Sequence, residues 1–182
     1  MPPPLRAAGK HGIAYRPMAD EDLPFVADLY ASTRAEEVAQ TGWPAAQQQA
    51  FLDQQHRAQH LHYRNVFPDA EWLIVERGGE RIGRLYLAES GDRVMLIDIS
   101  LVPAARGAGL GGAILADLMH AAGAAGKRVS LHVERLNPAR RLYVRHGFTL
   151  VSDKGIYLEM EWRPDGADGA AGAAGNQKKI AS

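Results

Sequence analysis

Between residues 13 and 163, apolar positions switch repeatedly between strand-like and helix-like spacing. Alternating or continuous apolar runs bounded by glycine, proline or charged residues predict strands. Apolar residues spaced three and four apart predict helices. The expected strands cover residues 12–18, 70–78, 80–90, 91–103, 127–135, 148–152 and 155–162, and the expected helices cover 20–33, 43–63, 110–122 and 137–147. The pattern therefore predicts an α+β protein with about seven strands and about four helices.

The two ends of the chain lack this periodicity. Residues 1–12 contain three prolines and two glycines, which favours a flexible N-terminal arm. Residues 164–182 are rich in glycine and alanine and carry one large apolar side chain, Ile180, so this tail is expected to be disordered. The folded domain is expected to span residues 13–163.

Composition narrows the function classes. The 182 residues suit one domain. The 21 basic residues equal the 21 Asp and Glu residues, so no overall basic field favours nucleic acid. The absence of cysteine excludes disulfides, thiolate zinc ligands and a thiol nucleophile. Residues 1–12 lack the apolar stretch of a signal peptide and no apolar run is long enough to cross a membrane, so we expect a cytoplasmic protein with neither a membrane nor a nucleic-acid partner.

A glycine cluster, RGAGLGG, lies between an expected strand and an expected helix. Glycines at such a junction allow a tight turn, and the helix N-terminus offers unpaired N–H groups to an anion. Gly107, Gly109 and Gly112 match G-x-G-x-x-G, and Glu134 follows 22 positions later, as in a dinucleotide site. Three features oppose that interpretation: PAAR separates strand and loop, an antiparallel meander precedes it, and too few residues follow for further parallel strands.

Counted from Arg106, the same stretch is R-x-x-G-x-G, with Gly109 and Gly111 in the glycine positions. LIDISLVP precedes it, and NPARRLYVRHGF follows the next strand. This combination closely resembles the GNAT superfamily of acyl-CoA-dependent N-acyltransferases, specifically over residues 95–148 and more loosely over 13–163. The resemblance implies a three-layer fold: a mixed, mostly antiparallel sheet flanked by helices, in which two central parallel strands splay apart.

The resemblance also implies acetyl-CoA as co-substrate and assigns residues to it. Backbone N–H groups of the loop would hold the pyrophosphate; the loop comprises Arg106, Gly107, Ala108, Gly109, Leu110, Gly111 and Gly112. The backbone of Leu101 and Val102 would pair with the pantetheine arm and polarise the thioester carbonyl. The Asn137 amide would bind the same arm, act as a helix N-cap, or do both.

Two catalytic roles follow. Tyr143 matches the family tyrosine that lies near the sulfur, and a phenol with a pKa of about 10 is able to protonate a departing thiolate; the alternative is a tyrosine that only packs in the core. The acceptor ammonium must lose a proton. Asp98 is the first candidate for this relay, since it interrupts an apolar strand together with Ser100. His132 and Glu134, on the neighbouring strand, are further candidates.

Other polar side chains are given simpler interpretations. His56 and His60 stand four apart, a spacing that suits a metal, but no third ligand is evident, so we expect a solvated helix face and no metal. Arg140 and Arg141 are expected to be exposed helix arginines. Trp43 and the second helix fall where the family builds its acceptor site.

The sequence thus favours an N-acetyltransferase that moves an acetyl group from acetyl-CoA to a primary amine of a small molecule or a protein. With no cysteine to carry the group, the amine would attack directly in a ternary complex. A non-catalytic acyl-CoA sensor or assembly module is the second hypothesis, and a dinucleotide enzyme is the third. Dimerisation through the terminal strands is also possible.

Overall fold

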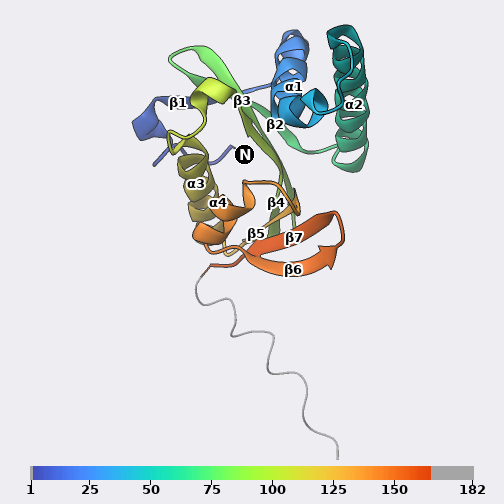
Figure 1. Ribbon diagram of the computed structural model, residues 1–182. Coiled ribbons are helices and arrows are strands. Elements are labelled where there is room, and N and C mark those ends of the chain that lie inside the picture. Colours follow the sequence, from blue (N-terminus) through green and yellow to red (C-terminus); the bar gives the residue numbers. More distant parts are fainter. Residues whose placement is uncertain (1, 165–182) are drawn as a thin grey trace, which may run out of the picture.

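A seven-stranded sheet with strand order β1-β2-β3-β4-β5-β7-β6 runs through the middle of the molecule (Figure 1). The computed structural model describes residues 2–164, so the predicted tail lies, apart from Pro164, outside the described residues. The strands of the sheet are β1 (Ile13–Pro17), β2 (Glu71–Arg77), β3 (Glu80–Ser90), β4 (Arg93–Leu101), β5 (Arg128–Glu134), β6 (Thr149–Lys154) and β7 (Tyr157–Trp162).

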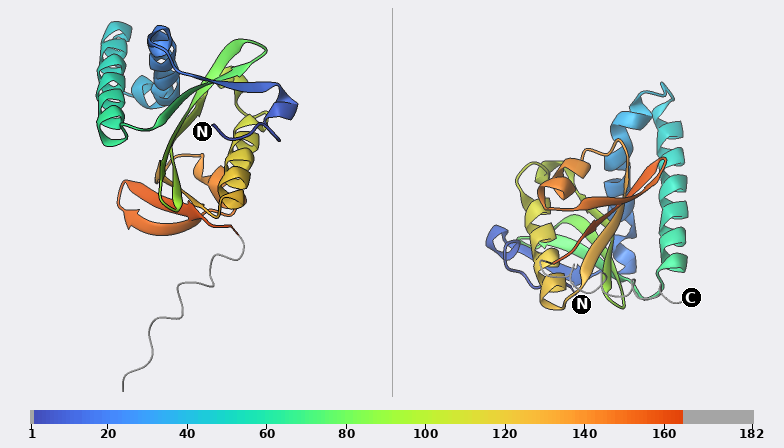
Figure 2. Two further views of the ribbon diagram at one scale, coloured as in Figure 1. Left: turned by 180° about the vertical axis from the view of Figure 1, so that it is seen from behind. Right: turned by 90° about the horizontal axis from the view of Figure 1, so that it is seen from below.

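Helices cover both faces of this sheet. The helices are α1 (Leu23–Ala39), α2 (Ala45–Val66), α3 (Leu110–Ala124) and α4 (Arg140–Arg145). Figures 1 and 2 show α1 and α2 side by side on one face, with α3 and α4 on the other. The predicted three-layer α+β architecture is confirmed.

The main core lies between α3 and the sheet. One apolar face of α3 is buried, and it meets the inward-facing residues of the central strands. Removing this much apolar surface from water is the main stabilising contribution to a domain of this size. The helix side chains in the core are Leu110, Ile114, Leu115, Leu118 and Ala122, and they pack with Leu85, Leu87, Leu96, Val129 and Leu131 among others.

Among the described strands, β4 and β5 are the one pair that runs in parallel, and their pairing is short. It joins Arg93–Leu96 to Arg128–Leu131, but β4 continues to Leu101 and β5 continues to Glu134 along β7. A bulge in β4, where the register with β3 shifts by one residue at Ile97, coincides with the end of this pairing. The two strands therefore splay apart, as predicted. A single parallel pair within an antiparallel sheet also excludes the doubly wound dinucleotide fold.

The first two helices differ from the prediction in their limits. α1 continues six residues beyond Thr33 to Ala39, and α2 ends at Val66 rather than at Tyr63. α1 begins at Leu23 rather than at residue 20, because Asp20 begins a 3₁₀ turn; within this turn Asp22 accepts hydrogen bonds from the Ala19 N–H and from Arg16. Which acidic residue is anchored here depends on the position of its cationic partner, Arg16. Helical spacing within one segment does not reveal that position.

The N-terminal segment, expected to be a flexible arm, contacts α3 through one buried carboxylate. Asp117 is 2% exposed and accepts the backbone N–H groups of Arg6, Ala7 and Ala8 at 2.7–2.9 Å. Ala8 is fully buried, and Arg6 also contacts His120. Part of residues 1–12 is therefore held against the domain, because a buried carboxylate needs this many donors.

Replacing this carboxylate tests how firmly the segment is held. We expect Asp117→Asn to lower the free energy of unfolding by about 2–3 kcal/mol, because charge-assisted hydrogen bonds are lost inside the protein. Chemical denaturation measures the change. Asp92→Asn is the matched control, since the Asp92 side chain is 73% exposed and its contact with Arg128 is 3.5 Å long. Equal effects of the two substitutions would contradict this account of Asp117.

Candidate active site

The end of β4 exposes backbone groups toward the splay. The Val102 N–H donates to the Ile82 carbonyl oxygen of β3 at 2.8 Å. Because antiparallel strands direct successive residues to opposite sides, Ile99 and Leu101 point their N–H groups away from β3. Pairing between β4 and β5 has ended there. The Val102 N–H is therefore already engaged by β3, whereas the Leu101 N–H is directed toward the splay, so of the two predicted residues only Leu101 has a backbone donor directed there.

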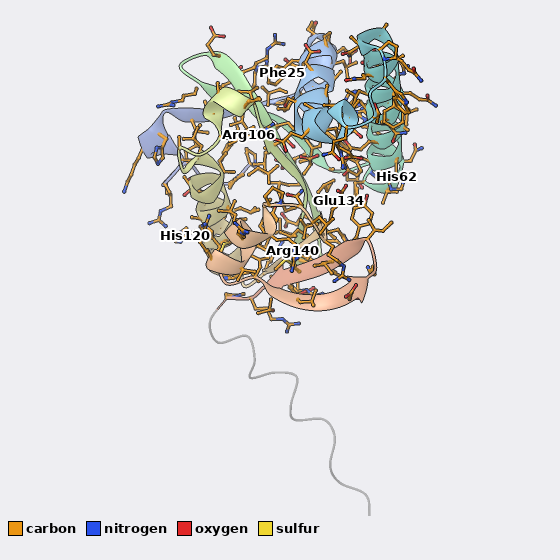
Figure 3. The ribbon with its side chains drawn as sticks, in the orientation of Figure 1. Phe25, His62, Arg106, His120, Glu134 and Arg140 are labelled. Carbon is orange, nitrogen blue, oxygen red and sulfur yellow. The ribbon has the colours of Figure 1, made fainter. Side chains whose placement is uncertain are left out.

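Arg106 bridges three elements at this edge. Its Nε donates to the Leu101 carbonyl oxygen at 2.7 Å, and its Nη2 donates to Ser32 Oγ of α1 at 3.0 Å. Figure 3 shows Arg106 in the region between the start of α3 and α1. A cation is thus held at the mouth of the glycine loop, where an anionic group would meet it.

The predicted glycine loop has the backbone of an anion cradle. Gly107 and Gly109 have φ values of 77° and 78°, a left-handed conformation that favours glycine. α3 begins at Leu110, whose side chain is 1% exposed and fastens the loop to the core. Within residues 2–164, no side chain caps this helix, so its first N–H groups lack the acceptor that a cap would supply. They remain available for an anion.

The last two glycines of the motif serve helix packing. A Cβ on Gly111 would lie 3.7 Å from Leu142, and one on Gly112 would lie 3.2 Å from His146 Nε2. Both neighbours belong to the α4 region, and it is Gly112, where a side chain would be too close to His146, that lets this region approach the first turn of α3. Gly147, with φ +83°, then ends α4 as predicted.

Asn137 begins the turn into α4. Its Oδ1 accepts the Ala139 N–H at 2.9 Å, which is a capping interaction. Its Nδ2 makes no hydrogen bond in the described part of the chain. The amide therefore has one group fixed and a donor left for another partner, so both predicted roles stay compatible.

The two arginines of α4 differ in their surroundings. Arg140 is half-buried and donates its Nη1 to the Arg135 carbonyl oxygen at 2.7 Å. The expectation of an exposed side chain is wrong for Arg140, because the preceding loop folds back over it. Arg141 is exposed, as expected.

Tyr143 is buried at the junction of core and splay. It is 7% exposed, and its ring lies 5.8 Å from that of Phe148. Burial, reinforced by the negative charge of Asp98, raises the pKa of its phenol well above the ordinary value. The phenol thus keeps its proton at any physiological pH. Its hydroxyl makes no hydrogen bond within the described residues, so the proton is not committed to another acceptor.

Asp98 is fixed from two sides. Arg84 Nη2 donates to Asp98 Oδ2 at 2.7 Å, and Ser100 Oγ donates to Oδ1 at 2.7 Å. Arg84 is 2% exposed and also donates to Gln59 of α2 at 3.1 Å. The burial of Arg84 and Asp98 is tolerated because each charge is neutralised by the other. The site thus contains a neutral ion pair rather than a lone carboxylate.

The other two relay candidates also have partners. Glu134 forms a two-point ion pair with Arg34 of α1. Figure 3 shows Glu134 between the α1–α2 pair and the β6–β7 hairpin. His132 Nε2 lies 3.2 Å from Lys154 Nζ, and burial together with the Lys154 charge lowers its pKa. The structure brings Asp98 close enough to Tyr143 to raise the pKa of its phenol, whereas Glu134 and His132 are held by other elements.

Several of these partners were not predicted. Arg84 stands in an alternating strand as an ordinary polar position, and only its pairing opposite Ser100 makes it internal. Arg34 lies beyond the predicted end of the first helix. The one signal in the sequence was the charge of Arg84 itself, because a charged residue at an inward position of a strand needs a buried partner.

His56 corrects the expectation of a solvated helix face. It is 5% exposed, and its ring lies 5.7 Å from Tyr30 and 6.0 Å from His60. Burial and the charge of Arg84 lower the pKa of His56 to about 4, so the ring is neutral at pH 7. Among residues 2–164, no group of three or more possible ligands stands close enough to hold a metal ion.

A groove of about 370 Å³ lies between α1 and α2. Its lining has no charged side chain, and Ser32 at its edge is the residue that Arg106 reaches. Trp43 lies just before α2 and is 37% exposed, and its ring makes an edge-to-face contact with that of Phe51 within α2. The groove consists of Ala31, Ser32, Ala35, Val38, Ala45, Gln48, Gln49 and Leu52.

The family of the chain follows from its sequence. Residues 30–148 match the model of the acetyltransferase (GNAT) family, and this match covers more than half of the chain. The chain therefore belongs to the GNAT acetyltransferase family, whose chemistry is acyl transfer. No curated protein matches the chain. No helix among the described residues is long and apolar enough to cross a membrane.

Solved structures share the fold. The PaiA N-acetyltransferase of Thermoplasma acidophilum, in complex with coenzyme A, is 16% identical over 83% of this chain and 98% of its own, with a TM-score of 0.62. An acetyltransferase of Thermus thermophilus is 20% identical over 83% and 96%, with a TM-score of 0.60. The ribosomal alpha-N-protein acetyltransferase RimL, in complex with coenzyme A, is 16% identical over 91% and 99%, with a TM-score of 0.58.

The low pKa of His56 makes stability depend on pH. The unfolded chain binds a proton near pH 6.5 and the folded chain only near pH 4, so protons favour unfolding between these values. We expect the free energy of unfolding to fall as pH drops from 6.5 toward 4, and His56→Gln to reduce this slope. His62→Gln, at an exposed position of the same helix, is the control. Identical slopes in both variants would contradict the assignment.

Proposed function

We propose that this protein is an N-acetyltransferase that transfers the acetyl group of acetyl-CoA directly to a primary amine, with a small molecule or a protein as acceptor. The observation that carries the proposal is the uncapped glycine loop that follows the unpaired end of β4, with the protonated Tyr143 on α4, the helix that contacts the first turn of α3.

The residues present fit an acyl-CoA thioester. The loop from Arg106 to Gly112 would hold the pyrophosphate through backbone N–H groups and the Arg106 guanidinium. The free edge of β4 at Ile99 and Leu101 suits an extended amide-bearing arm. The free Nδ2 of Asn137 supplies a further donor.

Each residue then has one task. Acetyl-CoA supplies an activated acyl carbon, which an amine nitrogen attacks. The Leu101 N–H stabilises the negative charge that develops on the carbonyl oxygen. Tyr143 gives its proton to the departing sulfur. Asp98, through water or directly, takes the proton that the amine nitrogen loses.

A non-catalytic acyl-CoA sensor would keep the loop but would not need an unengaged phenol. Release of free thiol from acetyl-CoA, measured with and without a panel of amines, separates the two functions. Amine-dependent release with formation of the N-acetyl product supports the enzyme. Binding of acetyl-CoA by calorimetry without release for any amine supports the sensor.

Gly109→Ala tests the loop. A side chain at φ +78° is strained and moves the backbone N–H groups, so we expect the affinity for acetyl-CoA in calorimetry to fall by about tenfold or more. Gly126→Ala is the control, because Gly126 has a similar φ of +65° and equally open space but lies past the other end of α3. Equal affinities of the two variants would remove the loop from the proposal.

Tyr143→Phe tests the acid. Removing the phenol proton should lower kcat by roughly 10²-fold while leaving the affinity for acetyl-CoA nearly unchanged. Tyr15→Phe is the control, since the Tyr15 hydroxyl is also buried but belongs to β1, near Asp117. An unchanged kcat in Tyr143→Phe would exclude this residue from the reaction.

A further inference from the structure

We propose that the acceptor enters as an uncharged amine, so that the natural acceptor is a weakly basic amine rather than an alkylammonium. This inference rests on the proposed function and concerns the acceptor side of the same site. It follows from how the charges beside the splay are paired.

The carboxylate nearest the reaction is already neutralised. Arg84 and Ser100 each donate to one oxygen of Asp98 at 2.7 Å. Arg84 is 2% exposed, so this cation cannot swing into solvent to make room for another. An ammonium arriving here would meet a buried guanidinium of like charge.

Apart from Arg84, the groups whose pKa the Asp98 charge shifts add no negative charge at neutral pH, while Asp53, whose charge also acts on His56, accepts a hydrogen bond from Gln49. Burial raises the pKa values of the tyrosines and lowers that of the histidine, so all of them are neutral. These neutral groups come from α2, β3 and α4, and they are His56, Tyr63, Tyr86 and Tyr143.

The carboxylates on the β5–β7 side are paired as well. Glu134 has Arg34, and Glu159 Oε2 lies 3.0 Å from Lys154 Nζ. Two aromatic rings that could hold a cation have one already. Arg64 lies 5.3 Å from the centre of the Trp72 ring, and Arg84 lies 5.1 Å from that of Tyr86.

A neutral site selects a neutral ligand. Burying an ammonium without an unpaired anion is costly, whereas an amine needs only hydrogen bonds. The reaction then needs no net proton release: the C–N bond forms, the C–S bond breaks, and the hydrogen lost by nitrogen replaces the one that Tyr143 gives to sulfur. Asp98, directly or through a water molecule, would pass that hydrogen back to the phenol.

Basicity therefore sets acceptor preference. At pH 7 an α-amino group with a pKa of about 7.8 is more than about 10% uncharged, whereas a lysine amine with a pKa of about 10.4 is about 0.04% uncharged. After allowance for the weaker nucleophilicity of the α-amino group, we expect kcat/KM on total amine to favour it by roughly 100-fold.

The experiment measures kcat/KM against pH from 6 to 9.5 for every amine of the panel that gives turnover, including alanylglycinamide and Nα-acetyl-lysinamide. The proposal expects a tenfold rise per pH unit up to the pKa of the amine itself. A profile that is flat below that pKa, or a preference for the lysine amine at pH 7, would overturn it. Absence of turnover for any amine despite acetyl-CoA binding would instead overturn the proposed function.

Unpairing one carboxylate gives an independent readout. Arg34→Met leaves Glu134 without its partner, so we expect the profile of Nα-acetyl-lysinamide to flatten and its kcat/KM at pH 6.5 to rise at least threefold relative to the wild-type enzyme. Lys127→Met is the matched control, because it removes a cation from Glu89 before the other end of β5. Loss of rate by the same factor at every pH would mean that Arg34 has only a structural role.

Discussion

The early end of the β4–β5 pairing is the constraint on which the rest of the site depends. Parallel hydrogen bonds join these strands only as far as Leu96 and Leu131, and from there each strand keeps one antiparallel neighbour. The bulge at Ile97 bends β4 away and reverses the faces of the residues that follow it. As a result, Asp98 faces α2, and the N–H of Leu101 faces the opening.

The two sides of this opening differ in whether their charged and polar groups are already paired. The loop side offers unpaired donors and a cation to an anionic group, through the uncapped α3 and Arg106. On the acceptor side, the carboxylates considered above each have a cationic partner. In the proposed reaction an anion and a neutral nucleophile would therefore bind at distinct places, and Tyr143, whose pKa the Asp98 charge raises, would act between them.

Local patterns predicted most of the fold. Apolar periodicity gave the seven strands and four helices, since each element buries one face against the core. The glycine motif located the loop, because positive φ and close helix approach require residues without a side chain. What failed depended on long-range partners: the engaged N–H of Val102 needs β3, and the burial of His56 needs α1. The pairing of Arg84 with Asp98 was equally hidden, because 14 residues separate them in the chain.

The central claim is that an acyl-CoA thioester lies along the free edge of β4 with its pyrophosphate on the glycine loop. Backbone amide NMR of the full chain, titrated with acetyl-CoA and separately with NADH, tests it most directly. The account predicts that acetyl-CoA shifts the amide signals of Ile99, Leu101 and residues 107–112 while that of Gly126 stays in place, and that NADH leaves them unchanged. Shifts confined to other elements, or an equal response to NADH, would contradict it.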